Sequence, residues 1–88
     1  MDLKEKFEQS VLHSRQLSKK PNNDELLKLY ALYKQATEGD VKGDRPGGFD
    51  FKGAAKFDAW LELKQKGSSD CMEEYILFVN DLHAKYNR

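Results

Sequence analysis

The chain contains 88 residues, the length of one small domain with a modest hydrophobic core. Its 15 Lys and Arg residues equal its 15 Asp and Glu residues, which argues against a general nucleic-acid-binding protein, because such proteins usually carry a basic excess. The single cysteine excludes an intrachain disulfide and is compatible with a reducing compartment. No secretory signal is visible, and no apolar run approaches the ~20 residues of a membrane span. We therefore expect one cytoplasmic, monomeric domain over residues 1–88, without stable membrane insertion.

The first predicted helix spans residues 3–17. Leu3, Phe7, Val11 and Ser14 recur at i, i+4, i+8 and i+11, which places them in one stripe along a helix. Charged residues occupy most positions between them. We interpret this stripe as the face that packs into the core.

The second predicted helix spans residues 23–37 and follows a break at Pro21. Asn22 with Glu25 three residues later fits a capping box. Leucine, tyrosine and alanine lie on more than one side of this helix. That distribution fits either the central helix of a bundle or a helix with a second face that receives an apolar ligand.

Residues 38–50 form a loop by composition, since they hold four of the six glycines and one of the two prolines. The loop is long enough to cross a distance, which allows the two flanking helices to run parallel. It contains neither the phosphate-binding GxxxxGK[ST] pattern nor the dinucleotide fingerprint GxGxxG. The third predicted helix spans residues 51–64, and the fourth begins near Ser68 and ends near Tyr86. Because strand-like alternation is absent, we predict an all-α four-helix bundle.

Catalytic residues are not evident in the sequence. His13 and His83 fall in different predicted helices, and neither has a serine or cysteine near it in the sequence. Cys71 begins the fourth helix and is interpreted as a small, partly buried residue. Together the three are too few and too scattered for a zinc site. We predict neither an enzyme nor a resident cofactor.

A cluster of lysines and tyrosines gives better support for ligand binding. Tyr30, Tyr33 and Lys34 stand at i, i+3 and i+4, so they share one face of the second helix. Lys56 lies beside aromatic residues on the helix across the loop. Lysines can hold phosphates as point charges, and tyrosine rings can stack on a base. Spacing alone fits this interpretation and a plain core of tyrosines with solvated lysines equally well.

Three blocks of sequence resemble the acyl-CoA-binding protein family (diazepam-binding inhibitor-like). They are YKQATEGD at residues 33–40, RPG at 45–47 and DFKGAAKFDAW at 50–60, and the likeness extends over nearly the whole chain. The resemblance implies an up-down-down-up bundle with a long crossover between its second and third helices. It also implies binding of long-chain fatty acyl-CoA esters without chemistry, their transport and pool formation, and transient contact with acyl-CoA-using enzymes or membranes.

The resemblance also implies which positions bind the ligand. Lys34 and Lys56 match lysines that engage the CoA phosphates, Tyr30 and Tyr75 match tyrosines at the phosphate and ribose, and Tyr33 matches an aromatic residue near the adenine. The complete expected set is Arg15, Tyr30, Ala31, Leu32, Tyr33, Lys34, Lys56 and Tyr75. Arg15 replaces a common lysine, so its donor geometry differs. Ala54 also replaces a common lysine, and Phe57 a common tryptophan.

The acyl chain is expected to lie in an interhelical groove lined by apolar residues such as Leu27 and Val11. Two other classes of protein remain open. A helical interaction module could use the same groove for a peptide helix, although it would have no need of the lysine–tyrosine cluster. An enzyme acting on CoA thioesters would need a nucleophile and a base, which the sequence does not indicate.

Overall fold

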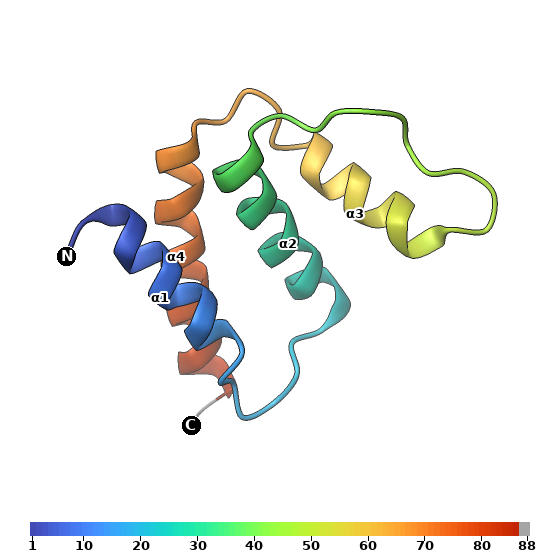
Figure 1. Cartoon of the computed structure of the whole chain (residues 1–88). Helices are drawn as coiled ribbons and strands as arrows, with labels where there is room; N and C mark the ends of the chain where they lie inside the picture. Colours follow the sequence, from blue (N-terminus) through green and yellow to red (C-terminus); the bar gives the residue numbers. More distant parts are fainter. Residues whose placement is uncertain (87–88) are drawn as a thin grey trace.

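The computed structural model describes residues 1–86, which form four α-helices and no β-strand (Figure 1). The helices are α1 (Leu3–Ser14), α2 (Asn23–Glu38), α3 (Phe51–Leu61) and α4 (Ser68–Tyr86). Their number and order confirm the predicted all-α fold. Within residues 1–86, none of these helices is both long and apolar enough to cross a membrane.

The helices run up, down, down and up, as predicted. Figure 1 shows α1 and α4 pointing one way, and α2 and α3 pointing the other. The segment between α2 and α3 makes this possible, because it returns the chain from the end of α2 to the side of the molecule where α2 began. The long crossover predicted from its glycine and proline content is therefore present.

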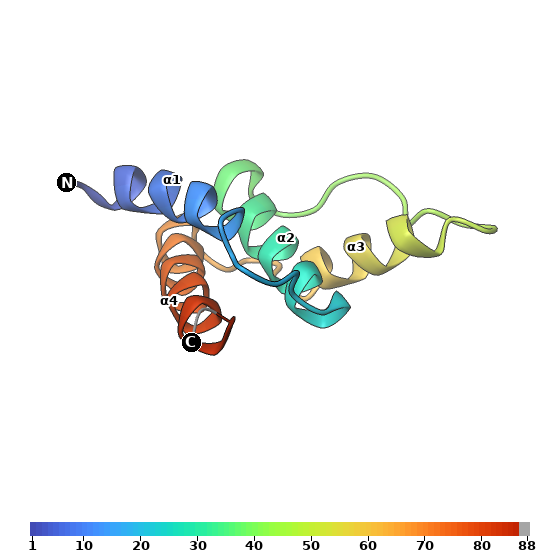
Figure 2. The same ribbon diagram turned by 90° about the horizontal axis from the view of Figure 1, so that it is seen from below.

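The four helices form a flat arrangement rather than a closed square. The molecule measures 39 × 28 × 15 Å along its principal axes. Helix α4 packs against α1 and α2, and α2 packs against α3. Within residues 1–86, α3 has α2 as its only helical neighbour. Figure 2 shows α3 and the crossover loop extending away from the other helices.

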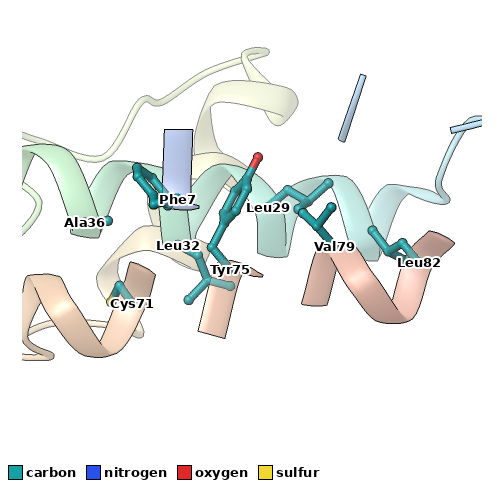
Figure 3. Close-up of a cluster of buried hydrophobic side chains, with 8 residues drawn as sticks. All are labelled: Phe7, Leu29, Leu32, Ala36, Cys71, Tyr75, Val79 and Leu82. Atoms are coloured by element: carbon teal, nitrogen blue, oxygen red, sulfur yellow. The ribbon is translucent and has the colours of Figure 1, made fainter. Parts of the chain in front are cut away.

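The hydrophobic core lies among α1, α2 and α4 (Figure 3). Phe7 of α1 meets the inner faces of α2 and α4, and α3 contributes no member of this cluster. Its buried members are Phe7, Leu29, Leu32, Ala36, Cys71, Tyr75, Val79 and Leu82. The burial of Phe7 confirms that the stripe predicted on the first helix faces the core, with Val11 packed at its edge.

Two helices end earlier than predicted. Helix α1 stops at Ser14 instead of residue 17, and α3 stops at Leu61 instead of residue 64. After each helix the backbone tightens into bonds that span three residues, such as Gln16 N–H to the His13 carbonyl at 3.0 Å and Lys64 N–H to the Leu61 carbonyl at 3.1 Å. These turns end the two helices. The periodic spacing of apolar side chains continues through the turns, so it could not indicate where each helix ends.

Glu25 connects the beginning of α2 to the end of α4. The predicted capping box is present: Asn22 Oδ1 accepts from Glu25 N–H at 2.8 Å, and Glu25 Oε1 accepts from Asn22 N–H at 2.9 Å. The Tyr86 hydroxyl and the Lys85 ammonium also donate to this carboxylate. The hydrogen bond from Tyr86, followed by those from Asn22 and Lys85, lowers the pKa of Glu25 from 4.5 to about 2.

Replacement of Leu32 should measure the contribution of the core. Leu32 is 1% exposed, so Leu32→Ala should lower the free energy of unfolding by about 2–5 kcal/mol through lost burial and a residual cavity. Leu77→Ala is the matched control, because Leu77 is 64% exposed and its loss should cost no more than ~0.5 kcal/mol. Urea unfolding followed by circular dichroism tests both. Similar losses would contradict the placement of the core.

Stability should depend on pH through Glu25. Because the folded pKa lies below the ordinary value of 4.5, the carboxylate stabilises the fold above about pH 4.5, and this contribution disappears as the pH falls to about 2. Glu25→Gln cannot titrate, so wild type and variant should converge in stability across this range. Urea unfolding at a series of pH values measures the difference. Parallel pH profiles would contradict the linkage.

Candidate ligand-binding site

Two lysine ammonium groups lie close to one tyrosine ring. Lys34 Nζ lies 5.9 Å and Lys56 Nζ 5.3 Å from the centroid of Tyr30. The Lys34 ammonium also lies 5.6 Å from the ring centroid of Trp60. Tyr30 and Lys34 come from α2, whereas Lys56 and Trp60 come from α3. The structure therefore brings together the lysines and the tyrosine that the sequence placed on either side of the crossover loop.

The two lysines differ in their electrostatic surroundings. Lys34 Nζ donates to Glu38 Oε2 at 2.5 Å, and this hydrogen bond raises the pKa of Lys34. Lys56 is exposed and has no ion pair within the part of the chain that the structure describes. The ring of Tyr30 thus has one neutralised and one uncompensated cation near it, which suits an anionic group that contacts both.

Trp60 is held in place by hydrogen bonds from its indole. Its Nε1–H is shared between Gln35 Oε1 at 3.0 Å and the Gly39 carbonyl at 2.8 Å. Gln35 is 1% exposed, and its amide nitrogen donates to Asp40 Oδ1 at 2.8 Å and to the Lys66 carbonyl at 3.1 Å. These bonds join α2, the start of the crossover loop, α3 and the loop before α4. They fix the end of α3 beside Lys34.

A row of aromatic rings crosses from α2 to α4 by way of α1. The ring of Tyr33 stacks on Phe7 with centroids 6.0 Å apart, and Phe7 meets Tyr75 edge-to-face at 5.1 Å. The Tyr75 hydroxyl lies 3.3 Å from Ser14 Oγ. Burial raises the pKa of Tyr75, while the hydrogen bond with Ser14 and the positive charge of Arg15 act in the opposite direction. The expected contact of Arg15 and Tyr75 with a ligand stays a prediction.

A groove of ≈ 430 Å³ lies between α2 and α3 beside this cluster. Leu26 and Leu27 supply apolar surface from α2, and Phe51 and Ala55 supply it from α3. Polar residues complete its lining, and none of them is acidic. They are Lys20, Asn23, Tyr30, Lys52 and Lys56. The apolar side chains of this groove would suit a hydrocarbon chain, and its lysines would suit an anionic group attached to that chain.

Two other hollows divide residues that were expected to lie together. One of ≈ 550 Å³ lies on the other side of the α2–α3 pair. Another of ≈ 530 Å³ lies between α1 and α2 and includes Val11 and Tyr33. Leu27 lines the grooves between α2 and α3 but not the hollow that contains Val11. The expected lining of one acyl-chain groove by both Leu27 and Val11 therefore stays a prediction, and in this structure the two residues line separate hollows.

Ala31 and Leu32 lie on the packed side of α2. They are 3% and 1% exposed, and both line the groove of ≈ 550 Å³ rather than the cluster around Tyr30. Their expected contact with a ligand stays a prediction, and in this structure they support the helix from within. Sequence reasoning missed Phe51, Ala55 and Leu26 as groove residues. The spacing of Leu26 with Tyr30, and of Phe51 with Ala55, could have indicated them.

The chemistry of the remaining candidates is limited. His13 and His83 come together, with ring centroids 6.0 Å apart and His83 Nε2 lying 2.8 Å from the His13 carbonyl oxygen. Cys71 is fully buried rather than partly buried, and burial raises the pKa of its thiol. Among residues 1–86, no group of three or more His, Cys, Asp or Glu side chains is arranged to hold a metal ion.

Comparison with known proteins decides the family. Residues 4–79 match the sequence profile described as acyl CoA binding protein. The chain belongs to the acyl-CoA-binding protein family. It is 48% identical over 81 residues to the acyl-CoA-binding protein of Saccharomyces cerevisiae, which covers 92% of this chain and 93% of the relative. It is also 48% identical over 80 residues to acyl-CoA-binding protein homolog 1 of Caenorhabditis elegans, covering 91% and 93%.

Solved structures of the family have the same fold. The crystal structure of Oryza sativa acyl-CoA-binding protein 2 aligns with a TM-score of 0.91 at 37% identity, covering 98% of this chain and 96% of that one. The crystal structure of the protein from Moniliophthora perniciosa aligns with a TM-score of 0.89 at 36% identity, covering 100% and 86%. The resemblance and the bundle predicted from the sequence are both confirmed.

Trp60→Phe should weaken the attachment of α3. The ring is kept, but both indole hydrogen bonds are lost and Gln35 Oε1 loses a donor in a buried position, which should cost about 1–3 kcal/mol of unfolding free energy. Urea unfolding followed by circular dichroism measures it. Gln35→Met removes the partner while keeping a side chain of similar length. In a double-mutant cycle the two losses should be less than additive, and full additivity would contradict direct coupling.

Proposed function

We propose that this protein binds one long-chain fatty acyl-CoA ester without chemical change and carries it within the cytoplasm as a protected pool. One observation supports the proposal most strongly. Two lysines lie near the ring of Tyr30, and beside them is an apolar groove without acidic residues. This combination matches a ligand that has phosphates at one end and a hydrocarbon chain at the other. Membership of the family supports it, since the relatives described above are named for acyl-CoA binding.

The phosphates would bind between Lys34 and Lys56. A CoA 3′-phosphate offers several acceptor oxygens, and lysine ammonium groups are compact donors for them. The Tyr30 hydroxyl adds a neutral donor at the same position. Lys34 must exchange Glu38 for the phosphate, but an exposed pair of this kind stabilises the free protein by only ~0–1 kcal/mol. Releasing the Lys34 ammonium from Glu38 to bind a phosphate would therefore cost little free energy.

The adenine and ribose would lie towards the aromatic row. Tyr33 is 40% exposed and lies on the same face of α2 as Tyr30, so its ring is open to stacking with a base. Arg15 at the end of α1 would reach the phosphates from an exposed position. The ring of Tyr75 is buried in the core, so only its hydroxyl, which lies beside Ser14, would contact the ribose. Ala31 and Leu32 would act behind this surface by keeping α2 in register.

The acyl chain would occupy the groove between α2 and α3. Burying ~14 methylenes at ~0.8 kcal/mol each gives on the order of 11 kcal/mol. Ordering the ligand and losing its free motion oppose this by a comparable amount, roughly 4–15 kcal/mol. Tight binding therefore requires the phosphates as well as the chain. A free fatty acid lacks the phosphates and free CoA lacks the chain, so both should bind much more weakly.

The other two classes are less well supported. A peptide-binding module would use the groove but not the two lysines around Tyr30. An enzyme would need a nucleophile with a base, and the only cysteine is fully buried in the core. We therefore assign no catalytic role to this chain.

Lysine variants test the assignment of the phosphates. Lys34→Ala and Lys56→Ala should each weaken binding of palmitoyl-CoA about 10- to 100-fold, because each removes a charged hydrogen-bond donor. Lys56→Ala should have the larger effect, since Lys34 must first leave Glu38. Lys28→Ala is the matched control, because Lys28 lies over Phe78 on the other side of α2 and should not alter affinity.

Isothermal titration calorimetry with palmitoyl-CoA, free CoA and palmitate measures these effects. One-to-one binding of the ester, with far weaker binding of both fragments, is expected. Unchanged affinity in both lysine variants would exclude the phosphate assignment. Absence of binding by the wild-type protein would exclude the proposed function itself.

A further inference from the structure

The groove between α2 and α3 has lysines at both of its ends. Lys56 lies near the ring of Tyr30 at one end, which we call the proximal end. Asn23 precedes Tyr30 by seven residues on α2, which corresponds to about 10 Å along a helix. Lys52 precedes Lys56 by four residues on α3, and Figure 1 shows α2 and α3 pointing the same way. Lys52 and Asn23, with Lys20 just before α2, therefore form the other end, the distal end.

The surface between the two ends is apolar. Leu26 and Leu27 line it from α2, and Ala55 lines it from α3. Phe51, at the start of α3, adds a ring that is 75% exposed. With the phosphates held at the proximal end, as proposed above, a hydrocarbon chain along this surface would direct its last carbon atoms towards the distal end. The distal end is thus the part of the groove that meets whatever group terminates the chain.

The protein does not neutralise the two lysines of the distal end. Lys20 and Lys52 are exposed, and neither has an ion pair among residues 1–86. Two acidic residues close to them in sequence are directed elsewhere. Asp24 lines the groove on the other side of the helix pair, and Asp50 caps α3 by accepting from Gly53 N–H at 3.0 Å. The distal end therefore offers two uncompensated cations, which a chain ending in a methyl group would leave unused.

We infer that the groove also accepts acyl-CoA esters whose chain ends in a carboxylate, such as the monothioester of a long-chain dicarboxylic acid. The inference rests on the proposed function, because it concerns the far end of the same ligand. The terminal carboxylate would lie between Lys20 and Lys52, and the Asn23 amide would add a neutral donor. A groove with an apolar closed end would exclude such a chain, because the carboxylate would lose its water without gaining a partner. The distal end leaves the carboxylate in water and supplies the partners.

Magnitudes decide whether the carboxylate would stay at the distal end. If it avoided this end, the chain would withdraw its last methylenes into water and lose about fourfold in affinity for each. A carboxylate held by exposed lysines avoids that loss and gains up to about fivefold for each ion pair. Esters with and without the terminal carboxylate should therefore bind with similar affinities. The gain from the ion pairs should diminish as the salt concentration rises, because exposed charges are screened.

Calorimetry with hexadecanedioyl-CoA and palmitoyl-CoA tests the distal end, because the two esters have chains of equal length and differ only at the last carbon. The wild-type protein should bind both with affinities within about fivefold of each other. The double variant Lys20→Gln with Lys52→Gln should weaken binding of hexadecanedioyl-CoA about tenfold more than binding of palmitoyl-CoA. Lys28→Gln is the matched control, since Lys28 lines the opposite groove and its loss should leave the ratio of the two affinities unchanged.

The ratio of affinities separates this inference from the proposed function. Absence of palmitoyl-CoA binding by the wild type would reject the proposed function. Wild-type protein that binds palmitoyl-CoA, but binds hexadecanedioyl-CoA more than about tenfold more weakly, would reject the distal site alone. An unchanged ratio in the double variant, or an equal change in Lys28→Gln, would also overturn the inference. Both substituted lysines are exposed, so urea unfolding should show that the double variant keeps the wild-type stability.

Discussion

The hydrogen bonds of the buried Gln35 amide are the interaction on which the proposed ligand site depends. Helix α3 packs against α2 alone among the helices of residues 1–86 and adds nothing to the core shared by the other three. Its position is therefore set by its contacts with α2 and with the loops on either side of it. Gln35 accepts from Trp60 and donates to Asp40 and to the Lys66 carbonyl, while being 1% exposed. Because an unsatisfied buried polar group costs ~1–3 kcal/mol, these bonds strongly favour one placement of α3.

The placement of α3 determines how close the ammonium groups of Lys34 and Lys56 lie to each other. Lys34 directly precedes Gln35 on α2, and Lys56 lies four residues before Trp60 on α3. Fixing Gln35 against Trp60 therefore brings the two ammonium groups to the same tyrosine ring. Two like charges repel at such a position, but the ring of Tyr30 attracts both and Glu38 neutralises one. The proposed phosphate site is in this sense organised before any ligand arrives.

The hydrophobic core and the proposed acyl-chain groove occupy different parts of the fold. Helices α1, α2 and α4 enclose the core, whereas α2 and α3 enclose the groove. Helix α2 belongs to both, with Leu32 facing the core and Tyr30 facing the groove. A second packed layer around α3 would strengthen the fold, but it would also fill the space that the proposed acyl chain needs. The flat shape of the molecule, only 15 Å along its shortest axis, follows from leaving that side open.

The sequence by itself determined the four helices, the cap of α2 and the crossover. Asn22 with Glu25 specified the start of α2, and glycines and Pro46 specified a loop, because these features act through local backbone chemistry. The i, i+3, i+4 spacing also placed Tyr30, Tyr33 and Lys34 on one face, and the family motifs indicated Lys56 as their partner.

Only the tertiary structure decided which surfaces meet. Spacing along a helix fixes a face but not its neighbour, so the sequence could not indicate that Val11 and Leu27 line separate hollows of the free protein. The ends of α1 and α3 were missed because the turns that follow them are set by tertiary contacts, such as the hydrogen bond from Gln65 N–H to Asp40 at 2.7 Å. The junction at Gln35 also joins chain segments far apart in sequence, at Trp60 and Lys66, which no local pattern encodes.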